Sequence, residues 1–199
     1  MKERSLKTLF DDAVDPLARM AATRANAHAS TVADVSISLL LLVEGARRSD
    51  IHTAAVILTI TAGLLLYSFI EYCFHRWLFH GGPIQVLEEG HAQHHVDPLG
   101  YDALPFFLPP IALLVLAGLF ALMMPTSYAL LLAGAIGMGY ATYGIVHSIM
   151  HLRRFTHALS RRWAASHHIH HHHPGHNFGV TTSLWDYVLG TRYSSRSKR

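Results

Sequence analysis

The chain has 199 residues, of which 51% are apolar and only 15% are charged. A soluble domain carries roughly 25% charged residues, so this composition favours one membrane-embedded domain over a soluble one. The formal net charge of +3 comes without a basic patch interleaved with aromatic residues, so nucleic acid is not an expected partner. The single cysteine, Cys73, excludes both an intrachain disulfide and a zinc finger of paired cysteines.

The first 30 residues are polar, carry four acidic side chains and have no long apolar core, so they do not resemble a secretion signal. We expect residues 1–30 to form a polar, partly helical lead-in on the membrane surface. Residues 31–192 are expected to form one membrane-embedded domain, and residues 193–199 a basic tail.

Four apolar stretches follow in chain order: 31–45, 51–74, 104–124 and 127–150. A helix needs roughly 20 apolar residues to cross a bilayer, a length that the last three reach and the first does not. Gly137 and Gly139 in the fourth stretch favour close contact with a neighbouring helix.

The connections at 47–50 and 124–127 are short, so the helices are expected to pair as two antiparallel hairpins. Both histidine-rich segments and both termini then lie on one side of the membrane. Most of the basic residues gather there too, which makes that side cytoplasmic by the positive-inside rule, although Arg47 and Arg48 lie opposite. The predicted fold is therefore all-α: about four transmembrane helices in two hairpins, with a cytoplasmic helical cap that holds the histidines.

Most of the 17 histidines fall into four spaced groups. They are His75 and His80 in HRWLFH, His91, His94 and His95 in HAQHH, His147 and His151 in HSIMH, and the run HHIHHHH from His167 to His173. Positions i, i+3 and i+4 share a helix face, so HAQHH converges on one side. His75 and His80 diverge around a straight helix, so one of them must lie beyond its end or the site must lie across it.

Imidazole suits zinc, copper, iron and nickel, and about ten such ligands suit two ions rather than one. Packing alone does not explain so many histidines at one membrane face. An expression tag does not explain HHIHHHH, because the run is internal and interrupted by Ile169. The sequence therefore predicts a dinuclear metal site.

The pattern HX4H, HXXHH, HX3H, HXXHH resembles the fatty acid hydroxylase / sterol desaturase superfamily of membrane di-metal oxygenases. The segments EYCFHRWLFHG, GHAQHHVDP, GYATYGIVHSIMH and HNFGVTTSLWDYVLGT are most similar to the catalytic domain of fatty acid 2-hydroxylases. This resemblance implies hydroxylation of a lipid acyl chain at its 2-position by O2, with two iron ions whose places zinc can take in isolated protein. It implies as ligands His75, His80, His91, His94, His95, His147, His151, His168, His171 and His172.

The last group can be read in two registers, since His167, His170 and His171 fit HXXHH as well as His168, His171 and His172 do. Spacing alone does not choose between them. Family members commonly show HHXXHH, which favours the second register, with His170 facing away from the metals.

Catalysis also needs electrons, and the chain has neither a Rossmann loop nor ferredoxin cysteine spacing, so an external electron-transfer protein is the expected partner. Glu71, Asp97, Asp102 and Asp186 are candidates for orienting the imidazoles, or for capping helices and forming surface ion pairs. Two alternatives remain open: another superfamily oxygenase, such as a carotenoid hydroxylase or sterol desaturase, and a metal-transport or metal-storage membrane protein.

Overall fold

The computed structural model describes residues 16–48, 52–101 and 103–195, and these contain helices and loops but no strand. The all-α prediction is confirmed. The elements in chain order are α2 (Arg24–Ala46), α3 (Thr53–Cys73), the π-helix η1 (Phe74–Phe79), α4 (Gln85–Val96), α5 (Leu108–Ala121), α6 (Thr126–Leu152), α7 (Ala158–His172) and α8 (Leu184–Val188). Residues 1–15 and 196–199, which include much of the predicted lead-in and tail, lie outside the described residues, as does Asp102.

Within the described residues, three helices are long and apolar enough to cross a membrane: Arg24–Ala46, Thr53–Phe79 and Thr126–Leu152. The predicted lengths need correction at two places. The first stretch is not too short, because its helix has 23 residues and begins before residue 31, whereas α5 has only 14. Residues 24–30, predicted to belong to the lead-in, therefore continue the first span.

Polar side chains explain why the first span begins early. Asn26 and Ser30 lie on the buried face of α2 and hold the loop before α5. The Asn26 amide nitrogen and the Ser30 hydroxyl both donate to the Leu104 carbonyl, and the Asn26 amide oxygen accepts from the Phe106 N–H. Asn26 and Ser30 are polar, but their hydrogen bonds are made inside the protein, so they are compatible with a membrane-spanning helix.

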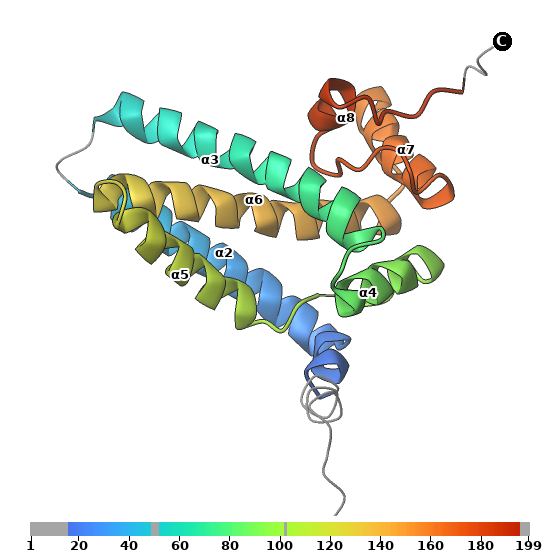
Figure 1. Ribbon diagram of the computed structural model, residues 1–199, viewed down its shortest axis with the longest axis horizontal. Helices are drawn as coiled ribbons and strands as arrows, with labels where there is room; N and C mark the ends of the chain where they lie inside the picture. Colours follow the sequence, from blue (N-terminus) through green and yellow to red (C-terminus); the bar gives the residue numbers. More distant parts are fainter. Residues whose placement is uncertain (1–15, 49–51, 102, 196–199) are drawn as a thin grey trace, which may run out of the picture.

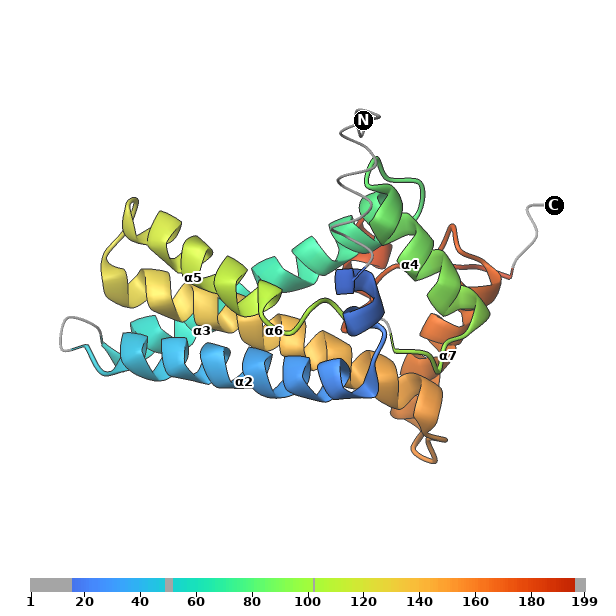
Figure 2. The ribbon, with the colours of Figure 1, turned by 90° about the horizontal axis from the view of Figure 1, so that it is seen from below.

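The centre of the membrane-embedded part is α6, against which α2, α3 and α5 all pack. Figure 2 shows α2, α5 and α6 lying side by side. Small residues on α6 permit this, as predicted: a Cβ on Gly137 would lie 2.4 Å from Ser38 Oγ, and one on Gly139 would lie 2.5 Å from the Tyr67 ring. The backbone of α6 therefore lies directly against side chains of α2 and α3. Such close packing stabilises helix pairs in a membrane, where the hydrophobic effect does not drive helices together.

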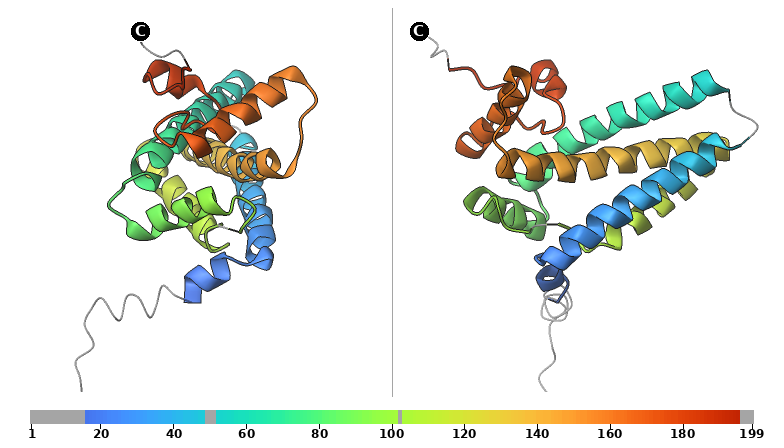
Figure 3. Two further views of the ribbon diagram at one scale, coloured as in Figure 1. Left: turned by 90° about the vertical axis from the view of Figure 1, so that its right-hand side faces the viewer. Right: turned by 180° about the vertical axis from the view of Figure 1, so that it is seen from behind.

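The histidine-bearing elements gather at one end of the bundle (Figure 1). The last turn of α6 and η1, which continues α3, reach that end, where α4, α7 and α8 form a cap. The C-terminal end of α2, the N-terminal end of α3 and the link from α5 to α6 lie at the other end. Figure 3 shows the same arrangement from two further directions. Both histidine-rich segments therefore lie at one end of the bundle, as predicted.

Candidate metal centre

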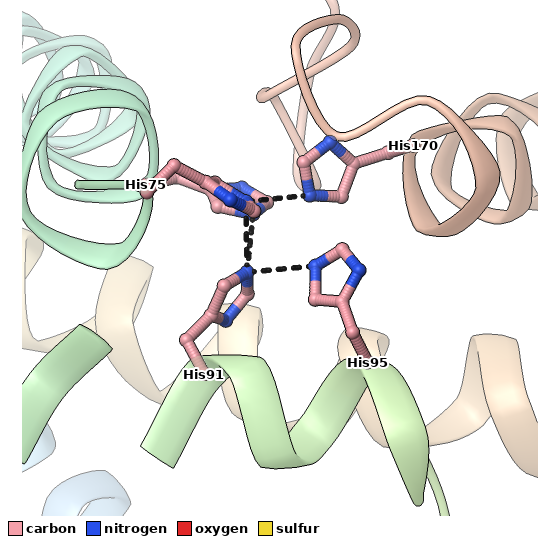
Figure 4. A group of neighbouring side chains, drawn as sticks. His75, His91, His95 and His170 are labelled. Carbon is pink, nitrogen blue, oxygen red and sulfur yellow. Dashed lines mark hydrogen bonds between the residues drawn. The ribbon is translucent and has the colours of Figure 1, made fainter. Parts of the chain in front are cut away.

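Ten histidines form two clusters of five. The ligand nitrogens within each cluster all lie within 4.8 Å of one another. The first cluster comprises His75, His80, His91, His95 and His170, and the second comprises His94, His147, His151, His167 and His171. Figure 4 shows four members of the first cluster converging from η1, α4 and α7.

The π-helix η1 resolves the five-residue spacing of His75 and His80. A π-helix bonds residue i to residue i+5, so residues five apart come close to alignment, which an α-helix does not allow. His75 lies in the π-helical turn and His80 is its C-cap, with non-helical backbone angles. Their rings stack with centroids 5.3 Å apart. The sequence indicated that a straight α-helix would point His75 and His80 in different directions, and the π-helical turn brings them together.

Each HXXHH motif serves both clusters. On α4, His91 and His95 are one turn apart and belong to the first cluster, whereas His94 belongs to the second. On α7 the roles are reversed, since His167 and His171 belong to the second cluster and His170 to the first. We expected His91, His94 and His95 to converge on one side of the helix, and the structure adds that they divide between the two clusters.

The structure gathers the other register of the last motif, one residue away from the predicted one. His167 and His170 are buried members of the clusters, while His168 and His172 are exposed and outside them. The cause is the packing of α7. The Trp163 indole N–H donates to the Val180 carbonyl, and Ala164 packs with Met150 and Val180, which fixes the rotation of the helix.

The short contacts between ring nitrogens in the first cluster cannot all be hydrogen bonds. His91 Nε2 lies 3.1 Å from the Nε2 atoms of His75 and His80, and 3.0 Å from that of His95. A neutral imidazole nitrogen has either one hydrogen or one lone pair, so it cannot make three hydrogen bonds at once. A cation between these nitrogens removes the conflict.

The same spacing fits a metal ion. Imidazole nitrogens bind metals at about 2.0–2.1 Å, so two ligands at a right angle around one ion lie about 3 Å apart. In the second cluster His167 Nε2 lies 2.9 Å from His151 Nε2 and 3.1 Å from His171 Nε2. Both clusters thus have the donor type and the spacing that a metal centre requires.

Two ligand rings are oriented by backbone carbonyls. His75 Nδ1 lies 2.5 Å from the Phe178 carbonyl oxygen, and His170 Nδ1 lies 2.7 Å from the His176 carbonyl oxygen. Because a carbonyl only accepts, the hydrogen of each neutral ring is on Nδ1 and the lone pair is on Nε2, facing the cluster. Sequence reasoning missed these partners, because a backbone carbonyl leaves no signature in residue type.

Burial keeps the clustered histidines neutral. It lowers the pKa of His80 and of His94 to about 4, with a further contribution from neighbouring imidazoles. Burial likewise lowers the pKa of His170 to about 3, and the pKa values of His91 and His167 are also strongly lowered. Since only the neutral imidazole binds a metal, the protein stabilises the ligand form.

The carboxylates considered as imidazole partners do not contact the clustered rings directly. Glu71 and Asp186 are buried, yet their hydrogen bonds go to the loop between α7 and α8 and, for Asp186, to Thr191, rather than to a ring. Asp97 is exposed at the end of α4. Neither Glu71 nor Asp186 hydrogen-bonds an imidazole, so the direct orienting role for which they were candidates is not observed.

A cavity of about 480 Å³ reaches the ligands from outside. It is lined by three clustered histidines, two exposed histidines of α7 and three apolar residues: His95, His151, His171, His168, His172, Val96, Pro98 and Leu99. A larger cavity of about 550 Å³ lies beside α8 and has no clustered histidine in its lining. The smaller cavity is lined by members of both clusters, His95 from the first and His151 and His171 from the second.

Comparisons with known proteins agree with this site. Residues 60–191 match the family described as Fatty acid hydroxylase. A fatty acid 2-hydroxylase of Homo sapiens is 33% identical over 147 residues, covering 65% of this chain and 38% of the human protein. A dihydroceramide fatty acyl 2-hydroxylase of Arabidopsis thaliana is 29% identical over 154 residues, covering 70% of this chain and 62% of that protein. The chain thus matches less than two thirds of the length of either relative.

Among solved structures, full-length scs7p, in which only the hydroxylase domain is visible, has a similar fold. The TM-score is 0.75 and the sequence identity is 22%, with 90% of this chain and 70% of that chain covered. At this identity the match supports the architecture of the chain and nothing finer.

Proposed function

The chain belongs to the fatty acid hydroxylase family, and from that membership we propose that it is an O2-dependent hydroxylase of lipid acyl chains, acting at the 2-position. The observation that carries the proposal is the pair of five-histidine clusters at one end of a bundle of membrane-spanning length. The choice of the 2-position rests on the relatives, which are 2-hydroxylases at about 30% identity.

We assign the metal ligands by cluster membership. They are His75, His80, His91, His95 and His170 for one ion, and His94, His147, His151, His167 and His171 for the other. This assignment keeps eight of the ten residues implied by the sequence and replaces His168 and His172 with His167 and His170.

We further propose that both ions are iron. Imidazole ligands accept iron and zinc alike, but zinc has no redox chemistry. Bound iron would supply the electron transfer that O2 activation requires. The contribution of the protein is to hold ten neutral imidazoles in place and to limit access of water.

The proposed reaction balances as follows. One C–H bond of the acyl chain becomes C–OH, the second oxygen atom leaves as water, and two electrons and two protons enter. The electrons come from an external carrier protein. The 480 Å³ cavity is within the usual size range of ligand pockets, and its apolar wall of Val96, Pro98 and Leu99 suits an acyl chain.

We place the metal centre on the cytoplasmic side. Arg153, Arg154, Arg161 and Arg162 are exposed at the histidine-bearing end, which is the location that the positive-inside rule gives to cytoplasmic arginines. Lys2, Arg4, Lys7 and the last basic residues of the chain, which also entered the prediction, lie outside the described residues.

Metal transport or storage is less well supported. A transporter places its polar ligands along the spans. Here the histidines form two compact sets at one end, and each set suits one ion. A carotenoid hydroxylase or sterol desaturase activity differs from the proposal in substrate, which the same experiment distinguishes.

The test is lipid analysis of cells with and without the protein, grown under 18O2. We expect acyl chains that gain one labelled oxygen, with fragmentation placing it on carbon 2. His167→Ala should abolish the product, whereas His157→Ala, which changes an exposed histidine outside the clusters, should retain it. An unlabelled product would overturn the oxygenase mechanism, and a labelled carotenoid or sterol would overturn the substrate assignment.

A further inference from the structure

The loop between α7 and α8 contains a segment, 176–181, that we call the strap. Two strap carbonyls accept hydrogen bonds from ligand rings: that of Phe178 from His75, and that of His176 from His170. Both rings belong to the first cluster. In the second cluster, by contrast, the buried Nδ1 of His167 has no hydrogen-bond partner among the described residues. The strap therefore orients rings of the first cluster through its carbonyls, whereas the buried Nδ1 of His167 in the second cluster has no such contact.

Two buried carboxylates hold four consecutive backbone N–H groups of the strap. Asp186 Oδ1 accepts from the Phe178 N–H at 2.9 Å, and its Oδ2 accepts from the Gly179 N–H at 2.8 Å. Glu71 Oε1 accepts from the N–H groups of Val180 and Thr181 at 2.7 and 2.9 Å. Asp186 is completely buried, and Glu71 is 5% exposed.

The geometry of the peptide group links Asp186 to His75. The Gly179 N–H and the Phe178 C=O belong to the same trans peptide unit, in which the two groups point in opposite directions. When Asp186 accepts from the N–H on one side, the carbonyl on the other side is directed at His75 Nδ1. No side chain fits at this point, since a Cβ on Gly179 would lie 2.0 Å from the Thr182 carbonyl oxygen.

Further hydrogen bonds fix the position of the Asp186 side chain. Thr191 Oγ1 donates to Asp186 Oδ1 at 2.7 Å and accepts from the Tyr72 hydroxyl, which in turn accepts from Arg76. Each carboxylate oxygen thus has a donor, and a cation stands at the far end of the chain of bonds. A carboxylate behind a peptide group polarises the carbonyl, which makes the imidazole beyond it a stronger ligand and fixes its tautomer.

We propose that Asp186 is a positioning residue for His75, acting through the Gly179–Phe178 peptide group, and that it sets the metal affinity of the first cluster but not of the second. Glu71, one helical turn before His75 on α3, holds the other end of the strap against the same helix. The inference rests on the metal-binding part of the proposed function. It adds that the two metal positions differ in affinity and that two residues outside both clusters cause the difference.

The experiment is a titration of the purified, metal-free full chain with Co²⁺, followed by the visible absorption of the bound ion. The wild type is expected to bind two ions. Asp186→Asn keeps the size of the side chain but removes its charge and one acceptor. It should bind one ion with wild-type affinity and the other about 10- to 100-fold more weakly.

Two reference variants identify the weakened position. The spectrum of the ion that Asp186→Asn retains should match that of His75→Ala, which disrupts the first cluster, and not that of His151→Ala, which disrupts the second. Trp185→Phe, at the residue before Asp186, is the matched structural control. It removes the hydrogen bond from the Trp185 indole to Ser68 Oγ and leaves the bonds to the strap in place. It should bind both ions normally.

A merely structural role for Asp186 predicts a different result: a lower melting temperature with both ions bound normally, or both weakened equally. Either outcome overturns the inference while the di-metal proposal stands. A wild-type chain that binds no Co²⁺ overturns both. Asp186→Glu, which keeps the charge but displaces it, gives the same comparison if Asp186→Asn does not fold, and we expect a smaller loss at the same position.

Discussion

His94 and His95 are neighbours in the sequence but members of different metal clusters, with ring centroids 6.3 Å apart. His170 and His171 on α7 divide in the same way, with centroids 6.2 Å apart. Each of these two helices, α4 and α7, therefore contributes neighbouring residues to both clusters. A shift of either helix would therefore disturb both clusters.

The register of α7 leads to the first prediction. Replacing His167 with alanine should remove one of two bound metals, because its ring lies within 3.1 Å of two other ligand nitrogens. Replacing His168, the exposed next residue, should leave both metals bound. Elemental analysis of the purified variants after loading with iron or zinc measures this. If His168→Ala loses a metal and His167→Ala does not, our assignment of the register is wrong.

The division of the HXXHH motif gives a second prediction. His94→Ala and His95→Ala should each reduce the metal content from two to one, but at different positions, because the two rings face different clusters. The Co²⁺ spectra of these two single-ion proteins should therefore differ from each other. The spectrum of His95→Ala should resemble that of His91→Ala. Identical spectra for His94→Ala and His95→Ala would contradict the assignment of the two residues to separate sites.

A third prediction concerns pH and the metal-free protein. The pKa values of His80 and His94 are lowered to about 4 in the folded state, whereas an unfolded chain titrates near 6.5. Below pH 6.5 the unfolded state binds protons that the folded state does not, so stability is complete above about pH 6.5 and decreases as pH falls toward 4.

Melting temperatures of the metal-free protein in detergent, measured from pH 7.5 to pH 4.5, test this third prediction. His94→Gln should flatten the curve, because it removes one of the histidines that the fold keeps neutral. His168→Gln, at an exposed position outside the clusters, should not change its slope. A wild-type curve that rises as the pH falls would mean that the clustered rings are charged in the folded protein.

The fourth prediction concerns helix packing. Gly139→Ala should destabilise the protein by about 1–3 kcal/mol, because the new Cβ would lie 2.5 Å from Tyr67 and force α3 away from α6. Gly118→Ala on α5 is the matched control, since no atom lies within 4 Å of its Cβ position. It should be neutral or stabilising, by up to about 1 kcal/mol. Thermal unfolding in one detergent compares the two, and equal losses would show that close packing at Gly139 is unimportant.

The identity of the metal gives a fifth prediction. Protein loaded with iron should hydroxylate its lipid substrate when O2 and an added electron carrier are present, and protein loaded with zinc should not, because zinc does not change oxidation state. Product formation by the two forms, measured at equal metal content, provides the test. Turnover by the zinc form would rule out the proposed oxygenase mechanism.

Much of the chemistry could be predicted from the order of residues alone. The spacing HX4H, HXXHH, HX3H and HXXHH indicates a site for two metals, because imidazole is a metal ligand and four groups of histidines are too many for packing. The apolar lengths predict membrane spans, and Gly137 and Gly139 predict the close helix contacts on α6. These features depend on residue type and local spacing, which the sequence states directly.

The tertiary structure decided what depends on rotation and on backbone groups. A helix rotates by about 100° from one residue to the next, so packing at Trp163 and Ala164 determines that His167 and His170 join the histidine clusters and His168 does not. The π-helical turn that aligns His75 with His80 has no distinct signature in residue type. The Phe178 carbonyl that orients His75 has none either, because it belongs to the backbone, and its direction is set by Asp186 from across the loop.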